Sequence, residues 1–265
     1  AALPRGGLLV EEIAGRPARL PDDLPAIARA LAALHALALP APAHRPPLRD
    51  APDPLRDLHD EIAAQWALGS RTVRTALAPE TVQALDRGLQ GLRALCDAPP
   101  RPARRLIAFD AHPGNFVLRP DGRAVLVDLE KARYGPPGLD LAHATLYTST
   151  TWDRTSRAVL TTAEAAAFHR DWEATVGPAC AAEARPWHGP LRHAMWLWSL
   201  SWCAKWRALS DRRPASGADG EDWSADRSDA DLVGHVAERV NHYLHPDTVT
   251  RVMAGLDALE RELTP

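Results

Sequence analysis

The sequence predicts an α+β fold that is mostly helical and carries one small antiparallel hairpin. Apolar residues recur at helical spacing over most of the chain, which is typical of amphipathic helices that pack on one another. Two short apolar runs flank the Pro-Asp-Gly sequence at residues 120–122, which is typical of a tight hairpin turn. A chain of 265 residues is long enough to bury a substantial core around these elements.

The helices follow from this spacing and from the residues that start them. Asp22 and Asp23 are candidate caps of the first helix, and Pro79-Glu80 is a pattern that favours a helix start. A proline-rich connector at residues 40–54 separates the first two helices. We expect helices at residues 22–37, 55–68, 79–96, 138–147, 161–176, 190–209, 231–244 and 246–263.

The predicted hairpin brings oxygen-bearing side chains toward one place. The apolar residues 106–109 predict a short buried strand that ends at Asp110. The turn at residues 120–122 fixes the register of the two strands. Asn115 then lies opposite Val127, or opposite Asp128 if the turn carries a bulge. An amide oxygen and two carboxylates should therefore converge at the open end of the hairpin.

This set of groups suits phosphoryl transfer with a divalent cation. Mg²⁺ takes oxygen ligands from one or two protein groups and leaves its other positions to water and phosphate, which makes Asn115 and Asp128 candidate ligands. A further carboxylate can accept the proton of an attacking hydroxyl, and Asp110 is the candidate for that role. The spacing D-x-x-x-x-N, followed by a hairpin and a second Asp, is typical of kinase catalytic loops.

Three segments resemble the aminoglycoside phosphotransferase and choline kinase-like family. The sequence D-A-H-P-G-N at residues 110–115 resembles the D-x-H-P-x-N loop of that family, and V-D-L-E at residues 127–130 resembles its metal-binding I-D-W-E segment. G-L-D-L-A at residues 138–142 resembles the segment in which an Asp supports the catalytic loop. Ala108 and Phe109 depart from the family, which usually has His-Gly there, so we expect Phe109 to anchor the loop by packing into the core.

The resemblance implies the large lobe of a protein kinase-like fold. Residues 18–265 would form the helical catalytic lobe, and residues 1–17 the hinge strand and the remnant of the small nucleotide-covering lobe. Backbone groups of Val10, Glu11 and Glu12 would then contact the adenine ring, whereas an ordinary edge strand is the alternative. Since no glycine-rich phosphate loop or strand lysine precedes this segment, the small lobe is expected to be largely absent.

The strand itself is expected at residues 7–13, with a turn at residues 14–17. Lys131 and Lys205 are the only lysines of the chain, and neither stands in a context that would replace a strand lysine.

The function implied by the resemblance is ATP-dependent phosphorylation of a hydroxyl on a small molecule, such as an aminoglycoside, a choline-like amine or a sugar. Asp110 would take the proton of the hydroxyl, and Asn115 and Asp128 would hold Mg²⁺ against the phosphates of ATP or another nucleoside triphosphate. His112 is expected to shape the loop. Two alternatives stay open: a catalytically inactive pseudokinase or ligand-binding fragment, and a helical protein whose hairpin binds no metal.

Several other residues allow both a structural and a functional interpretation. Asp140 either responds to a helix dipole or supports the catalytic loop, and His35 is a packed core histidine or, less favoured, a ligand. Trp198, Trp202 and Trp206 recur every four residues and predict a core stripe, whereas Trp196 could line a pocket that attracts a substrate ammonium group. The six acidic residues form a solvated loop or collect a cationic acceptor; they are Asp219, Glu221, Asp222, Asp226, Asp229 and Asp231.

Composition excludes some classes of partner. The formal net charge of −3 and the absence of a basic run argue against nucleic acid as a partner. Three widely separated cysteines indicate a reducing compartment, not a disulfide framework. The sequence shows no signal peptide and no membrane-spanning apolar run, so we expect a cytoplasmic protein with no membrane partner.

Overall fold

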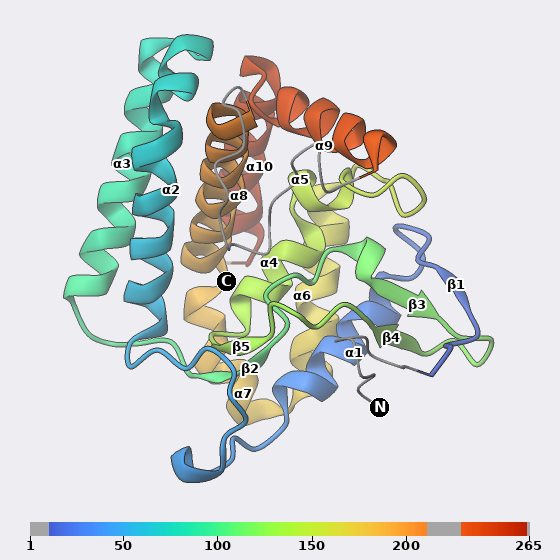
Figure 1. Cartoon of the computed structure of the whole chain (residues 1–265). Coiled ribbons are helices and arrows are strands. Elements are labelled where there is room, and N and C mark those ends of the chain that lie inside the picture. Colours follow the sequence, from blue (N-terminus) through green and yellow to red (C-terminus); the bar gives the residue numbers. More distant parts are fainter. Residues whose placement is uncertain (1–10, 211–228, 264–265) are drawn as a thin grey trace, which may run out of the picture.

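The computed structural model describes residues 11–210 and 229–263, and it is built from helices around two small antiparallel sheets (Figure 1). This architecture agrees with the α+β, mostly helical fold predicted from the sequence. The described α-helices are α1 (Leu24–His35), α2 (Pro54–Ala76), α3 (Pro79–Asp97), α4 (Gly138–Thr145), α5 (Tyr147–Thr150), α6 (Thr162–Val176), α7 (Pro178–Ala184), α8 (His188–Ser210), α9 (Ala230–Tyr243) and α10 (Pro246–Leu263). The described 3-10 turns are η1 (Pro42–His44), η2 (Pro113–Asn115) and η3 (Arg185–Trp187).

The strands are short and form two separate sheets. The first sheet has the order β1-β3-β4, with β1 at Arg16–Pro17, β3 at Phe116–Leu118 and β4 at Ala124–Leu126. The second sheet pairs β2 (Arg105–Ile107) with β5 (Arg133–Gly135). All pairings within the two sheets are antiparallel. In Figure 1 the first sheet lies on the opposite side of the molecule from the α2–α3 pair.

The described part of the N-terminal segment differs from the prediction. Of the expected strand at residues 7–13, residues 7–10 lie outside the described ranges and residues 11–13 have no regular structure. The strand is instead β1, at Arg16–Pro17, where the sequence predicted a turn. Gly15 explains this placement, because a Cβ atom there would lie 2.6 Å from the Leu118 carbonyl oxygen. The glycine lets the segment approach the hairpin closely and pair with it.

The hairpin of β3 and β4 has the predicted register without a bulge. The Arg119 amide donates to the Arg123 carbonyl at 2.9 Å, and Gly122 has the left-handed φ of +79° that the turn requires. The Val127 amide donates to the Asn115 carbonyl at 2.9 Å. Asn115 is therefore opposite Val127, which is the first of the two registers that the sequence allowed.

Local capping fixes where several helices begin. The Asp53 side chain accepts hydrogen bonds from the amides of Leu55 and Arg56 at the start of α2. Thr161 and Glu164 form a complete capping box at the start of α6. Asp229 caps α9 by accepting a hydrogen bond from the Asp231 amide. These polar contacts satisfy amides that have no partner within their own helix.

Helix α8 lies at the centre of the fold and packs against α2, α3, α4, α9 and α10. Their buried side chains form one core, and α1, α6, α7 and the hairpin form a second core. Helix α4 joins the two, since Leu139 and Ala142 belong to the first core and Leu141 and Ala144 to the second. Every residue of α4 is buried, so its position is strongly constrained.

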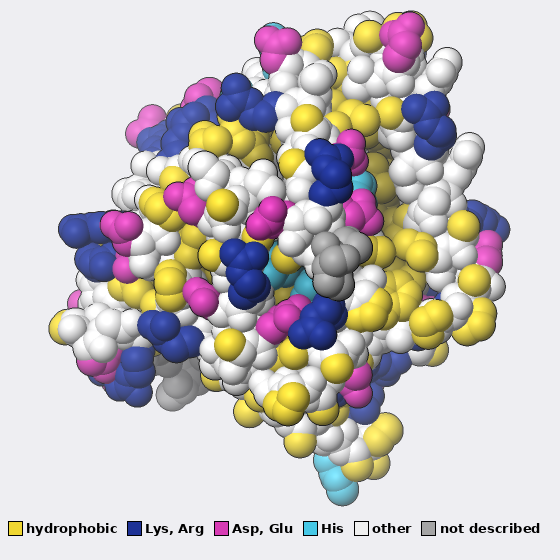
Figure 2. All heavy atoms as spheres, turned by 180° about the vertical axis from the view of Figure 1, so that it is seen from behind, with side chains coloured by type: hydrophobic (Ala, Val, Ile, Leu, Met, Phe, Trp, Pro, Cys, Tyr) yellow, Lys and Arg dark blue, Asp and Glu magenta, His cyan; other side chains and the backbone are white. Residues whose placement is uncertain are grey.

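The surface seen in Figure 2 carries interspersed acidic and basic side chains without a broad area of one charge. Near the middle of this face, histidine side chains are recessed between charged ones. Among the helices that the structure describes, none combines the length and the apolar character needed to cross a membrane.

Candidate active site

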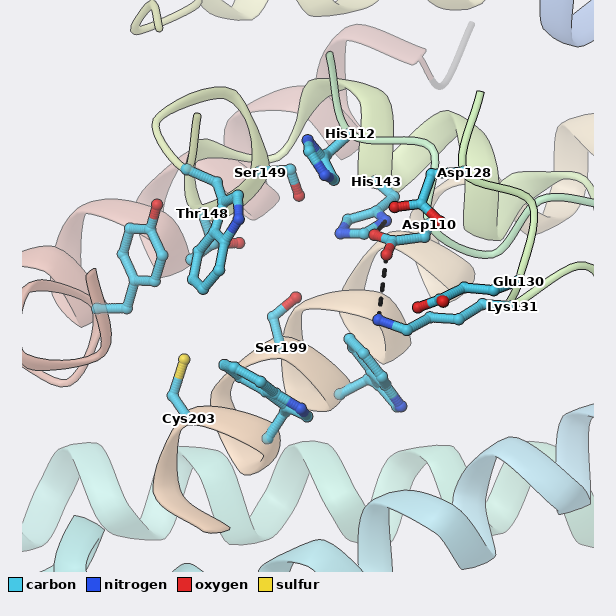
Figure 3. Close-up of a pocket in the computed structure, with 14 residues that line it drawn as sticks. Asp110, His112, Asp128, Glu130, Lys131, His143, Thr148, Ser149, Ser199 and Cys203 are labelled. Carbon is cyan, nitrogen blue, oxygen red and sulfur yellow. Dashed lines mark hydrogen bonds and ion pairs between the residues drawn. The ribbon is translucent and has the colours of Figure 1, made fainter. Parts of the chain in front are cut away.

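The three residues predicted to carry the chemistry lie at the open end of the β3–β4 hairpin. Asp110 follows β2, Asn115 ends η2 directly before β3, and Asp128 follows β4. The Asn115 side-chain amide donates to the Asp110 backbone carbonyl at 2.9 Å, which ties the two ends of the loop together. Asp110 and Asp128 line the same cavity (Figure 3), whereas Asn115 is buried and does not line it.

Asp140 of α4 supports the loop that carries Asp110. Its carboxylate is fully buried and accepts hydrogen bonds from the Ala108 amide at 2.8 Å and the Phe109 amide at 2.7 Å. Of the two interpretations left open, support of the loop is therefore confirmed. Because α4 is fixed between both cores, the position of the loop is determined by the packing of the whole fold.

His35 completes this buried network. Trp172 Nε1 donates to His35 Nδ1 at 3.0 Å, so the other ring nitrogen of a neutral His35 carries the proton. His35 Nε2 lies 3.1 Å from the Asp140 carboxylate and donates to it. His35 is thus the packed core histidine that the sequence favoured, and it contributes a third hydrogen bond to Asp140. Three donors compensate for the burial of this carboxylate.

Phe109 occupies a backbone position that favours glycine. Its φ is +64°, in the left-handed region, and its side chain is 1% exposed. The Arg133 guanidinium lies 3.5 Å from the centre of the Phe109 ring, and the Trp198 ring meets it edge-on at 5.2 Å. Trp198 and Arg133 both bond to Glu61, at 2.6 and 3.1 Å respectively. We call the side chains of Phe109, Arg133, Trp198 and Glu61 the Phe109 cluster. Their contacts confirm that Phe109 anchors the loop by packing.

His112 has the structural role predicted for it. Its Nδ1 accepts a hydrogen bond from the Gly114 amide at 3.1 Å, within the loop between Asp110 and Asn115. Burial lowers the pKa of His112, so the ring is neutral at pH 7 and Nδ1 remains available as an acceptor.

Lys131 and His143 set the charge around Asp110. Lys131 Nζ donates to Asp110 Oδ2 at 3.1 Å (Figure 3), and His143 Nδ1 lies 3.6 Å from Asp110 Oδ1. Burial would raise the pKa of Asp110, but His143 and Lys131 outweigh burial and hold that pKa below its ordinary value. Since burial lowers the pKa of His143 to about 4, Lys131 provides the positive charge that persists at neutral pH. Asp110 is therefore ionised at pH 7.

The cavity next to Asp110 has a volume of about 170 Å³ and an aromatic far end. Trp152 stacks on Tyr243 with ring centres 6.2 Å apart and meets Trp202 edge-on at 5.9 Å. Thr148 and Ser149 also line the cavity, and their buried hydroxyls have no hydrogen-bond partner among the described residues. The cavity thus combines the carboxylates of Asp110, Asp128 and Glu130 with aromatic rings and with hydroxyls that have no described partner.

The tryptophans of α8 do not divide between core and cavity as predicted. Trp196, expected as a pocket residue, is buried in the core with 4% exposure and does not line this cavity. Trp198 and Trp202, expected as core, line the cavity and also pack in the core, whereas Trp206 packs against the core only in part. Because α8 is buried on nearly all sides between Leu191 and Ala204, helical spacing alone could not show which side meets the cavity.

The two predicted magnesium ligands differ in their access to the cavity. Asp128 is exposed and lines the cavity, and over the part of the chain that the structure describes no hydrogen bond to its carboxylate is found. No group of three or more His, Cys, Asp or Glu side chains suited to a metal occurs within residues 11–210 and 229–263. The predicted ligands are Asp128, which lines the cavity, and Asn115, which is buried and does not line it. One carboxylate and one amide oxygen would suit the preference of Mg²⁺ for few protein ligands, and this role stays a prediction.

The structure does not bring the predicted nucleotide contacts into this site. Val10 lies outside the described residues, and Glu11 and Glu12 are exposed in an irregular segment before β1. Of the acidic residues proposed to collect a cationic acceptor, residues 219–226 also lie outside the described ranges. Contact with the adenine ring stays a prediction.

Sequence reasoning missed Lys131 and Trp152. Lys131 is one of two lysines in the chain and stands three residues after Asp128, a signal that could have identified it. Trp152 lies in the segment after α5, and only the folded chain brings it against Trp202 of α8. No local pattern predicts such a contact.

Comparison with known proteins agrees with this geometry. The model of the phosphotransferase enzyme family (APH) matches residues 3–177. None of the curated proteins matches the sequence.

Solved structures of similar fold include a choline kinase and aminoglycoside and spectinomycin phosphotransferases. The choline kinase LicA from Streptococcus pneumoniae shows 17% identity, a TM-score of 0.53, and coverage of 94% of this chain and 69% of that chain. An aminoglycoside phosphotransferase from Alicyclobacillus acidocaldarius shows 19% identity and a TM-score of 0.56, with 96% of this chain and 70% of that chain covered. The spectinomycin phosphotransferase APH(9)-Ia, solved with ADP and spectinomycin, shows 10% identity and a TM-score of 0.54 over 97% of this chain and 76% of that chain.

These likenesses confirm the fold, and the family model covers well over half of the 265 residues. The predicted resemblance is confirmed as well: this chain belongs to the phosphotransferase enzyme family.

Proposed function

We propose that this protein transfers the terminal phosphoryl group of ATP, or of another nucleoside triphosphate, to a hydroxyl of a small molecule. The observation that carries the proposal is the placement of Asp110 and Asp128 on one wall of a cavity large enough for a small acceptor. Membership in the phosphotransferase family supports the same reaction. ADP is present in one structure of similar fold, which supports an adenine nucleotide as the donor.

Asp110 has the position and charge of a general base. As the acceptor oxygen attacks the terminal phosphorus, the bond from that phosphorus to the bridging oxygen of the nucleotide breaks, and the hydroxyl proton moves to Asp110. Lys131 keeps Asp110 ionised before the reaction by its contact at 3.1 Å. Asn115 and Asp128 would hold Mg²⁺, which when bound neutralises charge on the phosphates. The remaining contribution of the protein is to position the reactants.

The cavity favours a compact acceptor with one positive charge. Trp152, Trp202 and Tyr243 present aromatic rings, whose faces attract cations such as ammonium groups. The hydroxyls of Thr148 and Ser149, which have no hydrogen-bond partner among the described residues, would bind polar atoms of the acceptor. Such an acceptor resembles the choline-like amines among the predicted substrates more closely than a polycationic aminoglycoside.

Replacing Asp110 with Asn tests the role of the base. We expect Asp110→Asn to lower kcat by roughly 10²–10⁴-fold, because an amide cannot accept the proton. Binding of Mg-ATP should change little, since Asn115 and Asp128 remain. The measurement is ADP release with a panel of hydroxylated amines and sugars, together with calorimetric titration of Mg-ATP. Asp247→Asn, at an exposed position on α10, is the matched control.

The result distinguishes the enzyme from the inactive alternative. If the protein binds nucleotide but releases no ADP with any acceptor of the panel, the result would support a pseudokinase. The presence of Ala108 and Phe109 in place of His-Gly favours this alternative. Retained turnover in Asp110→Asn would contradict the assignment of Asp110 as base. Loss of Mg-dependent nucleotide binding in Asp128→Ala is expected, and unchanged binding would remove Asp128 from the metal site.

A further inference from the structure

A second cavity, of about 100 Å³, lies on the other side of α5 from the candidate active site. Tyr147 of α5 lines the second cavity, whereas Thr148 and Ser149 of the same helix line the first one. The end of α4, the start of α6, and residues of α8 and α10 complete its walls. Nothing in the proposed transfer reaction uses this space.

The second cavity contains a buried cation with an incomplete set of partners. Arg192 of α8 lines it and is 7% exposed. Arg192 Nη1 donates to Thr145 Oγ1 at 2.6 Å, and Nη2 donates to the Thr145 carbonyl at 3.0 Å. Its Nε is buried and has no hydrogen-bond partner among the described residues. Burial lowers the pKa of Arg192 only to about 10, so the guanidinium is charged at pH 7.

No carboxylate compensates for this charge. Thr145 ends α4, whose carbonyl dipoles offset part of it, but no described acidic residue lies within ion-pair distance of Arg192. No Asp or Glu is found among the described residues that line the cavity. Glu164 at the start of α6 does not line it and is bonded to the Thr161 amide and hydroxyl. A buried cation without a carboxylate calls for an anion.

A second arginine lies at the same cavity. Arg251 of α10 is exposed and lines it, with its guanidinium 5.5 Å from the centre of the Tyr147 ring. Thr161 and Thr162 add hydroxyl-bearing side chains to the lining. Two guanidinium groups and no carboxylate at one cavity, in a chain of net charge −3, form an uncommon local excess of positive charge.

We propose that this cavity binds a small oxyanion, such as a phosphate group, between Arg192 and Arg251. Arg192 lines the cavity, and each of its Nη atoms carries a second N–H besides the one bonded to Thr145. Arg251 offers further donors from the surface. Guanidinium groups bind phosphate and carboxylate oxygens through paired hydrogen bonds. The apolar walls formed by Leu160, Leu256 and Leu259 limit the site to a compact ligand.

Titration of the full chain with inorganic phosphate tests the proposal. A parallel titration with acetate shows whether a carboxylate binds in place of phosphate. EDTA is present throughout, so that metal-dependent binding in the candidate active site does not contribute. We expect saturable binding of phosphate by calorimetry and a rise in Tm with phosphate concentration. Arg251→Gln should weaken binding about tenfold, because it removes a charge-assisted contact. Arg261→Gln, at an exposed position farther along α10, should leave the affinity unchanged.

Arg192→Met tests the buried arginine. The methionine side chain fills the space of the arginine without its charge, so this variant should not bind phosphate. If this variant does not fold, Arg251→Gln still decides the matter. The proposal is overturned if neither anion binds saturably, or if Arg251→Gln binds phosphate as well as the unmodified chain. It is also overturned if Lys131→Gln abolishes binding while Arg251→Gln does not, because phosphate would then occupy the candidate active site.

Discussion

At Phe109 the chain accepts an unfavourable backbone conformation and offsets it with packing. A side chain in the left-handed region costs about 1 kcal/mol, whereas a buried aromatic ring contributes about 3–5 kcal/mol. Arg133 and Trp198 enclose the ring from two sides. The balance favours Phe109 even though glycine would relieve the strain.

This balance predicts an unusual order of stability. Both Phe109→Ala and Phe109→Gly should lower the free energy of unfolding, but the glycine variant should be the more stable of the two by about 1 kcal/mol. The physical reason is that alanine keeps the strain at φ +64° and loses the packing. Urea unfolding checks the order, with Leu85 of α3 as control, where alanine should be the better replacement. Equal or reversed stabilities at Phe109 would show that the strain is absent.

At the scale of the elements, α2 and α8 approach one another closely at Gly69. A Cβ atom at Gly69 would lie 2.5 Å from the Lys205 backbone nitrogen, so only glycine fits between the helices. The sequence predicted that this helix ends at residue 68, directly before Gly69, whereas α2 continues to Ala76. Glycine usually marks a weak point in a helix, but here it allows α2 to continue to Ala76 against α8.

Gly69→Ala should therefore destabilise the protein by about 1–3 kcal/mol, even though alanine is the better helix former. Gly91 in α3 is the matched control, because no atom lies within 4 Å of a Cβ placed there. Gly91→Ala should raise the free energy of unfolding by about 0.5–1 kcal/mol. Thermal unfolding of the two variants provides the comparison, and a stabilised Gly69→Ala would contradict the close approach of the helices.

Local patterns predicted most helices but not every break. The expected helices at residues 79–96 and 246–263 correspond to α3 (Pro79–Asp97) and α10 (Pro246–Leu263), since apolar spacing and a proline in the first turn define both. The helix expected at residues 138–147 instead divides at Leu146, whose ψ of 142° ends α4 before α5 begins. The sequence around Leu146 contains no glycine or proline that would predict this break, which depends on tertiary packing.

For the site, sequence motifs predicted the loop and its support at Asp140, because those residues act within short segments. The aromatic cavity could not be predicted, since Trp152, Trp202 and Tyr243 come from three separate parts of the chain. Their contacts depend on how α8 and α9 pack, and that information is not local. The roles of Asp110, Asn115 and Asp128 in catalysis stay predictions.

For the molecule as a whole, buried histidines make stability depend on pH. Burial lowers the pKa of His143 from 6.5 to about 4, and it also lowers the pKa values of His112, His169 and His188. Each group binds its proton more readily in the unfolded chain. The stability that these groups contribute is therefore lost as the pH falls below the pKa of the unfolded chain. For His143 the contribution is complete above pH 6.5 and is lost as the pH falls from 6.5 toward 4. For His143 alone the loss is roughly 3 kcal/mol.

His143→Asn should reduce this pH dependence. Between pH 7 and pH 4, the free energy of unfolding should fall less in the variant than in the unmodified chain, by up to roughly 3 kcal/mol. Urea unfolding at a series of pH values measures the slope. His245→Asn is the control, because the His245 side chain is 60% exposed and should leave the slope unchanged. Parallel pH profiles for all three proteins would contradict a neutral, buried His143.

The Phe109 cluster has a consequence for how this protein can evolve. Trp198 lines the cavity next to Asp110 and also belongs to the group of side chains that encloses Phe109. If the proposed function holds, a mutation that shrinks Trp198 to admit a larger acceptor would at the same time loosen the loop that carries Asp110. New specificity at this wall should therefore arise together with slower turnover, and recovery of the rate should require a second substitution near Phe109, Arg133 or Glu61.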